Sequence, residues 1–438
     1  SSFLTDGINI LKQSMAIKIY SNFRLYHILL LLLVSAIFFP TLREGSGVRV
    51  DTLLIYLIVP LYILVKGFKL VFYDKKIKQL VLVVMLIPMA LFLSFIVRSV
   101  YSGEFTFSDS GPLFGFIRFL LFFILAAVAI HSEKDAKLIF TITLIGVGVH
   151  SFFALIEYFR VAPLDSMLSN FYNNEGFRLR LRGIGAFYRV HTLAFFLTIG
   201  FFLTLGLYKY YNKTIMKVLL IVCLAASIVP FSKISLLILI SAIFMHNIFL
   251  YKIKGLFLFT MILILMAIAV VFLLPESSYQ YLAKSINHLT IILDYIFFDN
   301  SIDSKALGSI SGRGETFGNV LRALDNSFLF GVGLNSEYGF TGDGLYFSIL
   351  SHDGFLGFFS LIFFLFYLFY LFYYKLKSTY FDRNLKLTAL FFLYTIVFGG
   401  LVSGVLGGRL LELLPILFIS LYVFIDRRYK KYCNTLEK

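Results

Sequence analysis

Arginines gather just ahead of an apolar run in the middle of the chain, in the segment FRLRLRGIGAFYRVHTLAFFLTIGF (177–201). Four of them fall within twelve residues: Arg178, Arg180, Arg182 and Arg189. A guanidinium group is planar and can grip a phosphate through two hydrogen bonds, whereas a lysine acts as a point charge. Single arginines at a membrane surface often only reach toward lipid head groups. A cluster of four favours a phosphate-binding site, for which Arg182 and Arg189 are the candidates.

A further arginine lies in the segment 309–359, which begins SISGRGETFG. The pattern predicts a helix from about Glu315 to Asn326, so Arg313 would lie at its N-terminal edge. Backbone N–H groups and the side chain could there converge on one anion, as in a pyrophosphate cradle. The alternative is a salt bridge from Arg313 to a nearby carboxylate.

Four more residues complete the candidate site. Lys233 lies in the bend PFSKISLL, where it could also be an interface anchor, and Arg409 follows SGVLGG. Asp343 and His352 are the candidate acid–base groups, because Asp343 lies where a long loop returns to the membrane and His352 interrupts an apolar run beside Asp353. A histidine near a membrane interface is more often packed and hydrogen-bonded than catalytic. His352 is a candidate because it is predicted to lie near the arginines.

Patterns for metals and cofactors are weak or missing in the sequence. GRGETFG is not a phosphate-binding Walker loop, and neither His/Cys ligand spacings nor an acidic metal signature occurs in the predicted outer loops. Cys223 and Cys433 lie in surroundings that do not suggest a disulfide. We therefore expect no metal, no cofactor and no nucleic-acid partner.

The composition indicates which kind of secondary structure must position these residues. Of the 438 residues, 59% are hydrophobic and only 14% are charged, and the mean hydropathy is +0.89. Such values exclude a water-soluble domain. Apolar runs of about 20 residues recur along the chain, and backbone polar groups in lipid must be satisfied within the segment. The sequence predicts an all-α, polytopic transmembrane protein.

Charges, glycines and prolines bound about twelve predicted spans: 25–40, 51–73, 79–97, 113–131, 138–159, 190–208, 216–230, 234–250, 255–274, 345–374, 386–405 and 410–426. The tenth is expected to break near Gly354, and the seventh and eighth to meet in a tight bend. Five regions follow: a cytoplasmic N-terminal segment 1–24, spans 1–9 over 25–274 with a periplasmic loop at about 160–189, a large periplasmic loop 275–344, spans 10–12 over 345–426, and a cytoplasmic basic tail 427–438. Residues 1–14 precede Met15 and are expected to be an expression remnant or an atypical start.

Lysine and arginine are distributed differently over the two predicted sides. Lysine-rich loops such as KGFKLVFYDKKIK and YKYYNK fall on the side of the tail RRYKKY, which the positive-inside rule makes cytoplasmic. The protein is therefore expected in a bacterial inner membrane, with both of its termini in the cytoplasm. Arginine dominates the opposite side, where the other cations are Lys233, Lys284 and Lys305. Arg118, within the fourth span, is the one good mid-span charge.

At these residues the chain resembles the Wzy-type O-antigen polymerases, relatives of the O-antigen ligases. The matching segments are RGIGAFYRVHTLAFFL, FSKISLLILI, SGRGETF and FGVGLNS followed by DGLYFSILSHDGFLGFF. Lys233 stands where arginine is usual in the family. Asp343-Gly344 stands where the ligase branch has a His-Asn pair, which favours the polymerase branch.

The resemblance implies a glycosyltransferase that joins repeat units on undecaprenyl pyrophosphate at the periplasmic face in lipopolysaccharide biosynthesis. Arg182, Lys233 and Arg313 would hold the pyrophosphate, while Asp343 or His352 would activate or orient the acceptor hydroxyl. Implied partners are a lipid-linked glycan donor and acceptor, membrane lipid and a chain-length regulator protein. Two alternatives stay open, an O-antigen ligase with lipid A core as acceptor and a lipid-linked oligosaccharide flippase or transporter.

Overall fold

The computed structural model describes residues 25–39, 50–66, 71–102, 111–172, 190–230, 233–251, 254, 260, 261, 318–333, 344–376, 383–402 and 410–436. The secondary structure in these ranges is helical, without strands. The labelled helices are α2 (Val50–Lys66), α3 (Lys75–Ser102), α4 (Gly111–Ala129), α5 (Glu133–Phe159), α6 (Leu164–Tyr172), α7 (Val190–Leu207), α8 (Lys213–Ile228), α9 (Lys233–Tyr251), α13 (Leu345–Leu376), α14 (Arg383–Val402) and α15 (Leu410–Leu436). Two shorter helices cover 25–38 and 318–326.

Local sequence explains where several of these helices begin. Ser132 caps α5, since its hydroxyl accepts from the Asp135 backbone N–H while the Asp135 carboxylate accepts from the backbone of Ser132. Asn212 caps α8 by accepting from two backbone N–H groups of its first turn.

Among the described residues, three helices are long and apolar enough to cross a membrane: Lys75–Val100, Glu133–Phe159 and Leu345–Phe372. Shorter apolar helices accompany them, among them Thr52–Val65, Leu113–Ala129 and Leu387–Gly400. An all-helical, membrane-associated architecture follows, whereas the total of twelve crossings stays a prediction. The predicted ninth span, 255–274, lies almost wholly outside the described residues.

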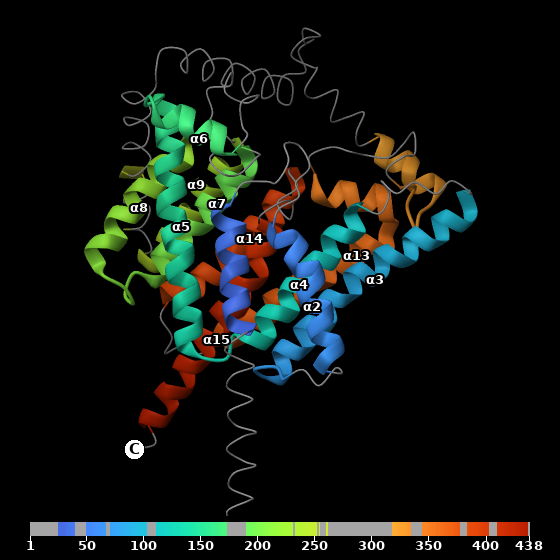
Figure 1. The fold of residues 1–438 in the computed structure, drawn as a ribbon, viewed down its shortest axis with the longest axis horizontal. Helices are drawn as coiled ribbons and strands as arrows, with labels where there is room; N and C mark the ends of the chain where they lie inside the picture. Colours follow the sequence, from blue (N-terminus) through green and yellow to red (C-terminus); the bar gives the residue numbers. More distant parts are fainter. Residues whose placement is uncertain are drawn as a thin grey trace, which may run out of the picture.

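Helix α15 lies at the centre of the bundle (Figure 1). Residues 412–426 are buried without exception, and α4 and α5 pack against them. Helix α13 packs against α3 and α14, and α7 against α14 and α8. Aromatic side chains fill the contacts, as where Phe119 of α4 meets Phe364 of α13 with ring centroids 5.7 Å apart.

The links before α3, α5 and α8 meet α15 near its C-terminal end. The contacts are hydrogen bonds from Tyr73 to Asp426 (2.7 Å) and from Tyr422 to Asp74 (2.6 Å), an ion pair between Arg428 and Glu133 (2.9 Å), and the Arg428 guanidinium 4.2 Å from the Tyr210 ring centroid. Lysine-rich loops that were expected on one side of a membrane therefore lie at one end of the bundle, where the C-terminus also leaves it (Figure 1). Which side faces the cytoplasm stays a prediction.

Two segments are more ordered than the sequence suggests. The basic tail 427–438 was expected to follow a span that ends at residue 426, but α15 continues as a helix to Leu436. Its first residues remain helical because Arg428 and Lys431 both bind Glu133 of α5. The predicted loop at 160–189 contains α6, which starts after a turn in which Arg160 binds Asp165.

Candidate functional site

The most irregular backbone in a long helix occurs in the middle of SHDGFLG. Helix α13 breaks at Gly354, whose φ of 63° and ψ of −164° are not helical. This break confirms the interruption that was predicted near Gly354. Only glycine adopts such a conformation at low cost, because a Cβ atom would collide with the neighbouring backbone. We refer to this point as the helix break.

A loop shortly before α13 in the sequence satisfies backbone groups that the helix break exposes. Residues 327–333 follow the short helix 318–326 and lie against α13. Four backbone hydrogen bonds join them: Val332 N–H to Ser351 C=O (2.9 Å), Gly333 N–H to His352 C=O (3.1 Å), Phe355 N–H to Phe328 C=O (3.0 Å) and Leu356 N–H to Leu329 C=O (3.1 Å). A helix interrupted inside lipid must satisfy its free backbone groups within the protein, and the 327–333 loop does so.

Two glycines make this contact possible. Gly331 and Gly354 both have positive φ, 68° and 63°. A Cβ atom on Gly331 would lie 2.5 Å from the backbone nitrogen of Gly354, and one on Gly354 would lie 2.5 Å from the carbonyl of Leu329. The loop and the broken helix therefore cross backbone to backbone, which holds the residues beside the break in fixed positions.

Charged and polar side chains lie next to the helix break. Nη1 of Arg98, near the end of α3, is 3.5 Å from Oδ1 of Asp353. Ser94, one turn earlier on α3, donates to the backbone carbonyl of Asp353 at 3.1 Å. Nδ1 of His352 is 3.3 Å from the Ser348 hydroxyl. The His352 and Asp353 residues are each 3% exposed, so this polar cluster is nearly dry.

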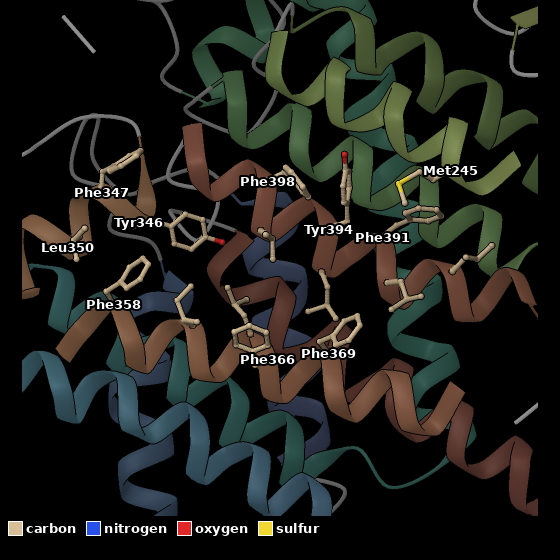
Figure 2. A pocket seen from close by; sticks show the side chains of 16 residues that line it. Met245, Tyr346, Phe347, Leu350, Phe358, Phe366, Phe369, Phe391, Tyr394 and Phe398 are labelled. Carbon is tan, nitrogen blue, oxygen red and sulfur yellow. The ribbon is translucent and has the colours of Figure 1, made fainter. Parts of the chain in front are cut away.

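An apolar groove of about 760 Å³ runs between α13 and α14. Figure 2 shows Tyr346, Phe358, Phe366 and Phe369 of α13 facing Phe398, Tyr394 and Phe391 of α14 across it. Met245 of α9 lies toward the end opposite Leu350 (Figure 2). An unbroken helix from residue 346 to 369 would extend roughly 35 Å, which is comparable to the hydrocarbon thickness of a bilayer.

The α13–α14 groove is open along one side. Phe366 is 68% exposed and Phe369 49%, although both line the groove. In a membrane, side chains exposed at this depth would face lipid, so a lipid chain could enter sideways. Leu350 and Phe358 line the groove on either side of the helix break. The apolar groove and the polar cluster are therefore neighbours along α13.

Of the predicted site residues, only His352 is described with its side chain. It lies at the helix break, as expected from the interrupted apolar run. Lys233 is the first residue of α9, which begins right after the predicted tight bend, but its side chain lies outside the described residues. The others lie outside the described ranges altogether, and their predicted roles stay predictions: Asp343, Arg182, Arg189, Arg313 and Arg409. The helix predicted to follow Arg313 does end at residue 326, as expected.

Sequence reasoning did not find the pairing of Arg98 with Asp353. Arg98 directly follows the predicted third span, 79–97, and so falls on the predicted outer side, while Asp353 is the neighbour of His352 in SHDG. Both signals were present, but nothing in the local sequence relates residue 98 to residue 353. Only the packing of α3 against α13 brings the two side chains together.

A buried ion pair that lies away from the groove connects three further helices. Arg118 of α4 lies 3.3 Å from Glu412 of α15 and donates to Thr52 of α2 at 3.2 Å. The Glu412 side chain is completely buried. Arg118 was predicted as a mid-span charge, whereas Glu412 was not recognised as its partner. None of the three residues lines the groove.

Neither a protein-family model nor a curated protein matches the chain. Within the described ranges, His, Cys, Asp and Glu side chains form no group of three that could hold a metal ion.

Proposed function

We propose that the chain is a membrane glycosyltransferase of the O-antigen polymerase type, which joins oligosaccharide repeat units carried on undecaprenyl pyrophosphate. The observation that carries the proposal is the position of the α13–α14 groove, whose lining residues flank the helix break and its Arg98–Asp353 pair. A lipid-linked diphosphate has the same two parts, a long apolar chain and an anionic head. The groove suits the chain, and a guanidinium beside it suits the head.

The proposed reaction is a glycosyl transfer without a metal. A hydroxyl oxygen of the acceptor unit forms a bond to the anomeric carbon of the donor glycan. The bond from that carbon to the phosphate oxygen breaks, and the diphosphate leaves with the electron pair. The acceptor hydroxyl loses its proton to a base or to water. Fixed guanidinium groups can stabilise the leaving charge in a site with little water, which is the largest need of such a reaction.

The helix break supports this proposal because irregular backbone at membrane depth is tolerated where it is buried in protein or lines a cavity. The 327–333 loop connects the break to the helix 318–326, which follows the predicted anion-binding residue Arg313. We propose that Arg313, Arg182, Arg189, Lys233 and Arg409 complete the diphosphate site, with Asp343 or His352 near the acceptor. The site would face the periplasm, and both termini the cytoplasm.

The ligase alternative uses the same chemistry with lipid A core as acceptor, so the same groove and cluster serve it. A flippase or transporter would instead move its substrate past charges within the membrane. The charges on Arg118 and Glu412 bind each other and connect three helices, which suits a fixed structural contact better than a transport path.

Deleting the chain from its host and restoring variants tests the proposal. Arg182→Ala and Arg313→Ala should abolish long polymer at normal protein levels, because the leaving diphosphate loses charge stabilisation, while Arg43→Ala should not. Glycan gels supply the measurement. Normal ladders from the first two variants would reject the assigned site. Restoration of long polymer in a polymerase-deficient strain distinguishes a polymerase from a ligase, since a ligase transfers glycan to lipid A core without extending it.

A further inference from the structure

The Arg98–Asp353 ion pair lies at the helix break, and Leu350 and Phe358, which line the α13–α14 groove, precede and follow that break along α13. Asp353 follows Tyr346 by seven residues, nearly two full turns, so both lie on about the same face of the first part of α13. Tyr346 and Leu350 on that part line the groove. The head of a lipid whose chain occupies the groove would therefore arrive close to Asp353 and Arg98.

The two charges differ in how firmly they are held. The backbone of Asp353 is fixed on three sides, by the hydroxyl of Ser94 and by the bonds of the 327–333 loop to the residues before and after the break. Arg98 lies on another helix and reaches Asp353 through a long side chain, with a separation of 3.5 Å. A guanidinium on so long a side chain can change partner by rotation about its own bonds, without movement of the backbone around Asp353.

A diphosphate is a stronger partner for arginine than a carboxylate is. It carries more negative charge, and its oxygens accept two parallel N–H bonds from the guanidinium fork. The Arg98 and Asp353 side chains are only 13% and 4% exposed, so water screens this competition weakly.

We propose that Arg98 exchanges Asp353 for the departing diphosphate, and that the Asp353 carboxylate then accepts the proton of the acceptor hydroxyl. This inference rests on the proposed glycosyl transfer and assigns two further residues to it. As the new bond from the acceptor oxygen to the anomeric carbon forms, the bond to phosphate breaks and its electron pair stays on the diphosphate, paired with Arg98. The acceptor proton moves to Asp353 and later to water. Donor binding thereby activates the base.

Binding and turnover of variants in the full chain test the exchange. The binding probe is undecaprenyl pyrophosphate, added to protein in nanodiscs, and turnover is the glycan ladder in the host. Asp353→Asn should bind the probe as tightly as wild type or more tightly, because Arg98 no longer has a competing anion, while polymer falls about 10²- to 10⁴-fold with the base removed. Arg98→Gln should weaken binding about tenfold or more, because the charge-assisted hydrogen bonds of the guanidinium are lost. Asp353→Glu should recover part of the polymer.

Another ion pair of the same protein, Arg160 with Asp165, supplies the control variants. Arg160 and Asp165 lie 3.3 Å apart in the turn between α5 and α6, away from the groove. Arg160→Gln and Asp165→Asn should leave both probe binding and polymer near wild type. If Asp353→Asn fails to fold, the double variant Arg98→Gln/Asp353→Asn removes both charges and should fold, bind weakly and make no polymer.

The outcomes separate this inference from the function on which it rests. Equal losses of affinity and thermal stability in Asp353→Asn and Arg98→Gln would show a purely structural ion pair and overturn the exchange. Wild-type ladders from Asp353→Asn, or from the double variant, would overturn it too, with the polymerase proposal intact. A wild-type chain that makes no polymer would instead reject the proposed function itself.

Discussion

At the scale of single residues, glycine decides where the site can form. Gly354 has a backbone conformation that other residues avoid. The backbone of Gly331 packs directly against the backbone of Gly354, with no room for a Cβ atom between them. Both stand beside the residues that carry the charges. A side chain at either position would separate the 327–333 loop from α13 and leave backbone groups of the break without partners.

We expect Gly354→Ala to cost about 1–3 kcal/mol from its backbone conformation alone, with a further loss from the collision with Leu329. Thermal unfolding of the purified protein and the glycan ladder measure the two effects, and both should fall. Gly115→Ala in α4 is the matched control, since a Cβ atom there meets nothing within 4 Å. Equal behaviour of the two variants would contradict a role for the break.

Residue patterns predicted part of this site and missed the rest for a physical reason. The break near Gly354 and the position of His352 beside it follow from a glycine and polar residues inside an apolar run, which are local signals. The partners Arg98 for Asp353 and Glu412 for Arg118 come from distant helices. Helix packing chooses such partners, and a single sequence does not contain the packing.

At the scale of elements, α15 organises the bundle. Its buried stretch 412–426 contacts α4 and α5, and the Arg118–Glu412 pair fixes its register against α4 and α2. Removing one charge of a buried pair leaves the other without compensation. The boundaries of α15 also show the limit of pattern reading, because the basic residues that suggest the end of a span continue as helix.

Glu412→Gln should therefore destabilise the protein by about 3–5 kcal/mol, whereas Arg118→Met/Glu412→Leu should recover most of that loss. Thermal midpoints in one detergent compare the variants. The exposed Arg160→Gln change supplies the reference for an ion pair of low energetic value. A double variant less stable than Glu412→Gln would show that the charges themselves, rather than their balance, hold α15.

At the scale of the whole molecule, contacts arrange the helix ends in two groups. The links before α3, α5 and α8 meet the C-terminal part of α15, and the polar cluster lies near the far ends of α3 and the first part of α13. Lysine in loops and alternation of apolar runs predicted that the links before α3, α5 and α8 share an end, and their contacts with α15 agree. The assignment of the lysine-rich end of the bundle to the cytoplasm rests on the positive-inside rule.

The two natural cysteines test the predicted orientation. Cys433 is partly exposed in the last turns of α15, and Cys223 is buried. A membrane-impermeant maleimide should label Cys433 in inverted vesicles and not in intact spheroplasts. Arg160→Cys in a Cys433→Ser background should show the reverse, because Arg160 lies at the other end of α5 from Glu133. Labelling of both from the same side would refute the orientation.

Transfer of a glycan from a lipid diphosphate is the central claim, and turnover by the purified chain tests it most directly. Protein in liposomes is supplied with undecaprenyl-pyrophosphate-linked repeat units from its host, and products are separated by length. We predict a ladder of glycans, with one undecaprenyl pyrophosphate released for each bond formed. Repeat units that stay at their starting length without release of the lipid diphosphate, in protein that remains folded, would contradict the account.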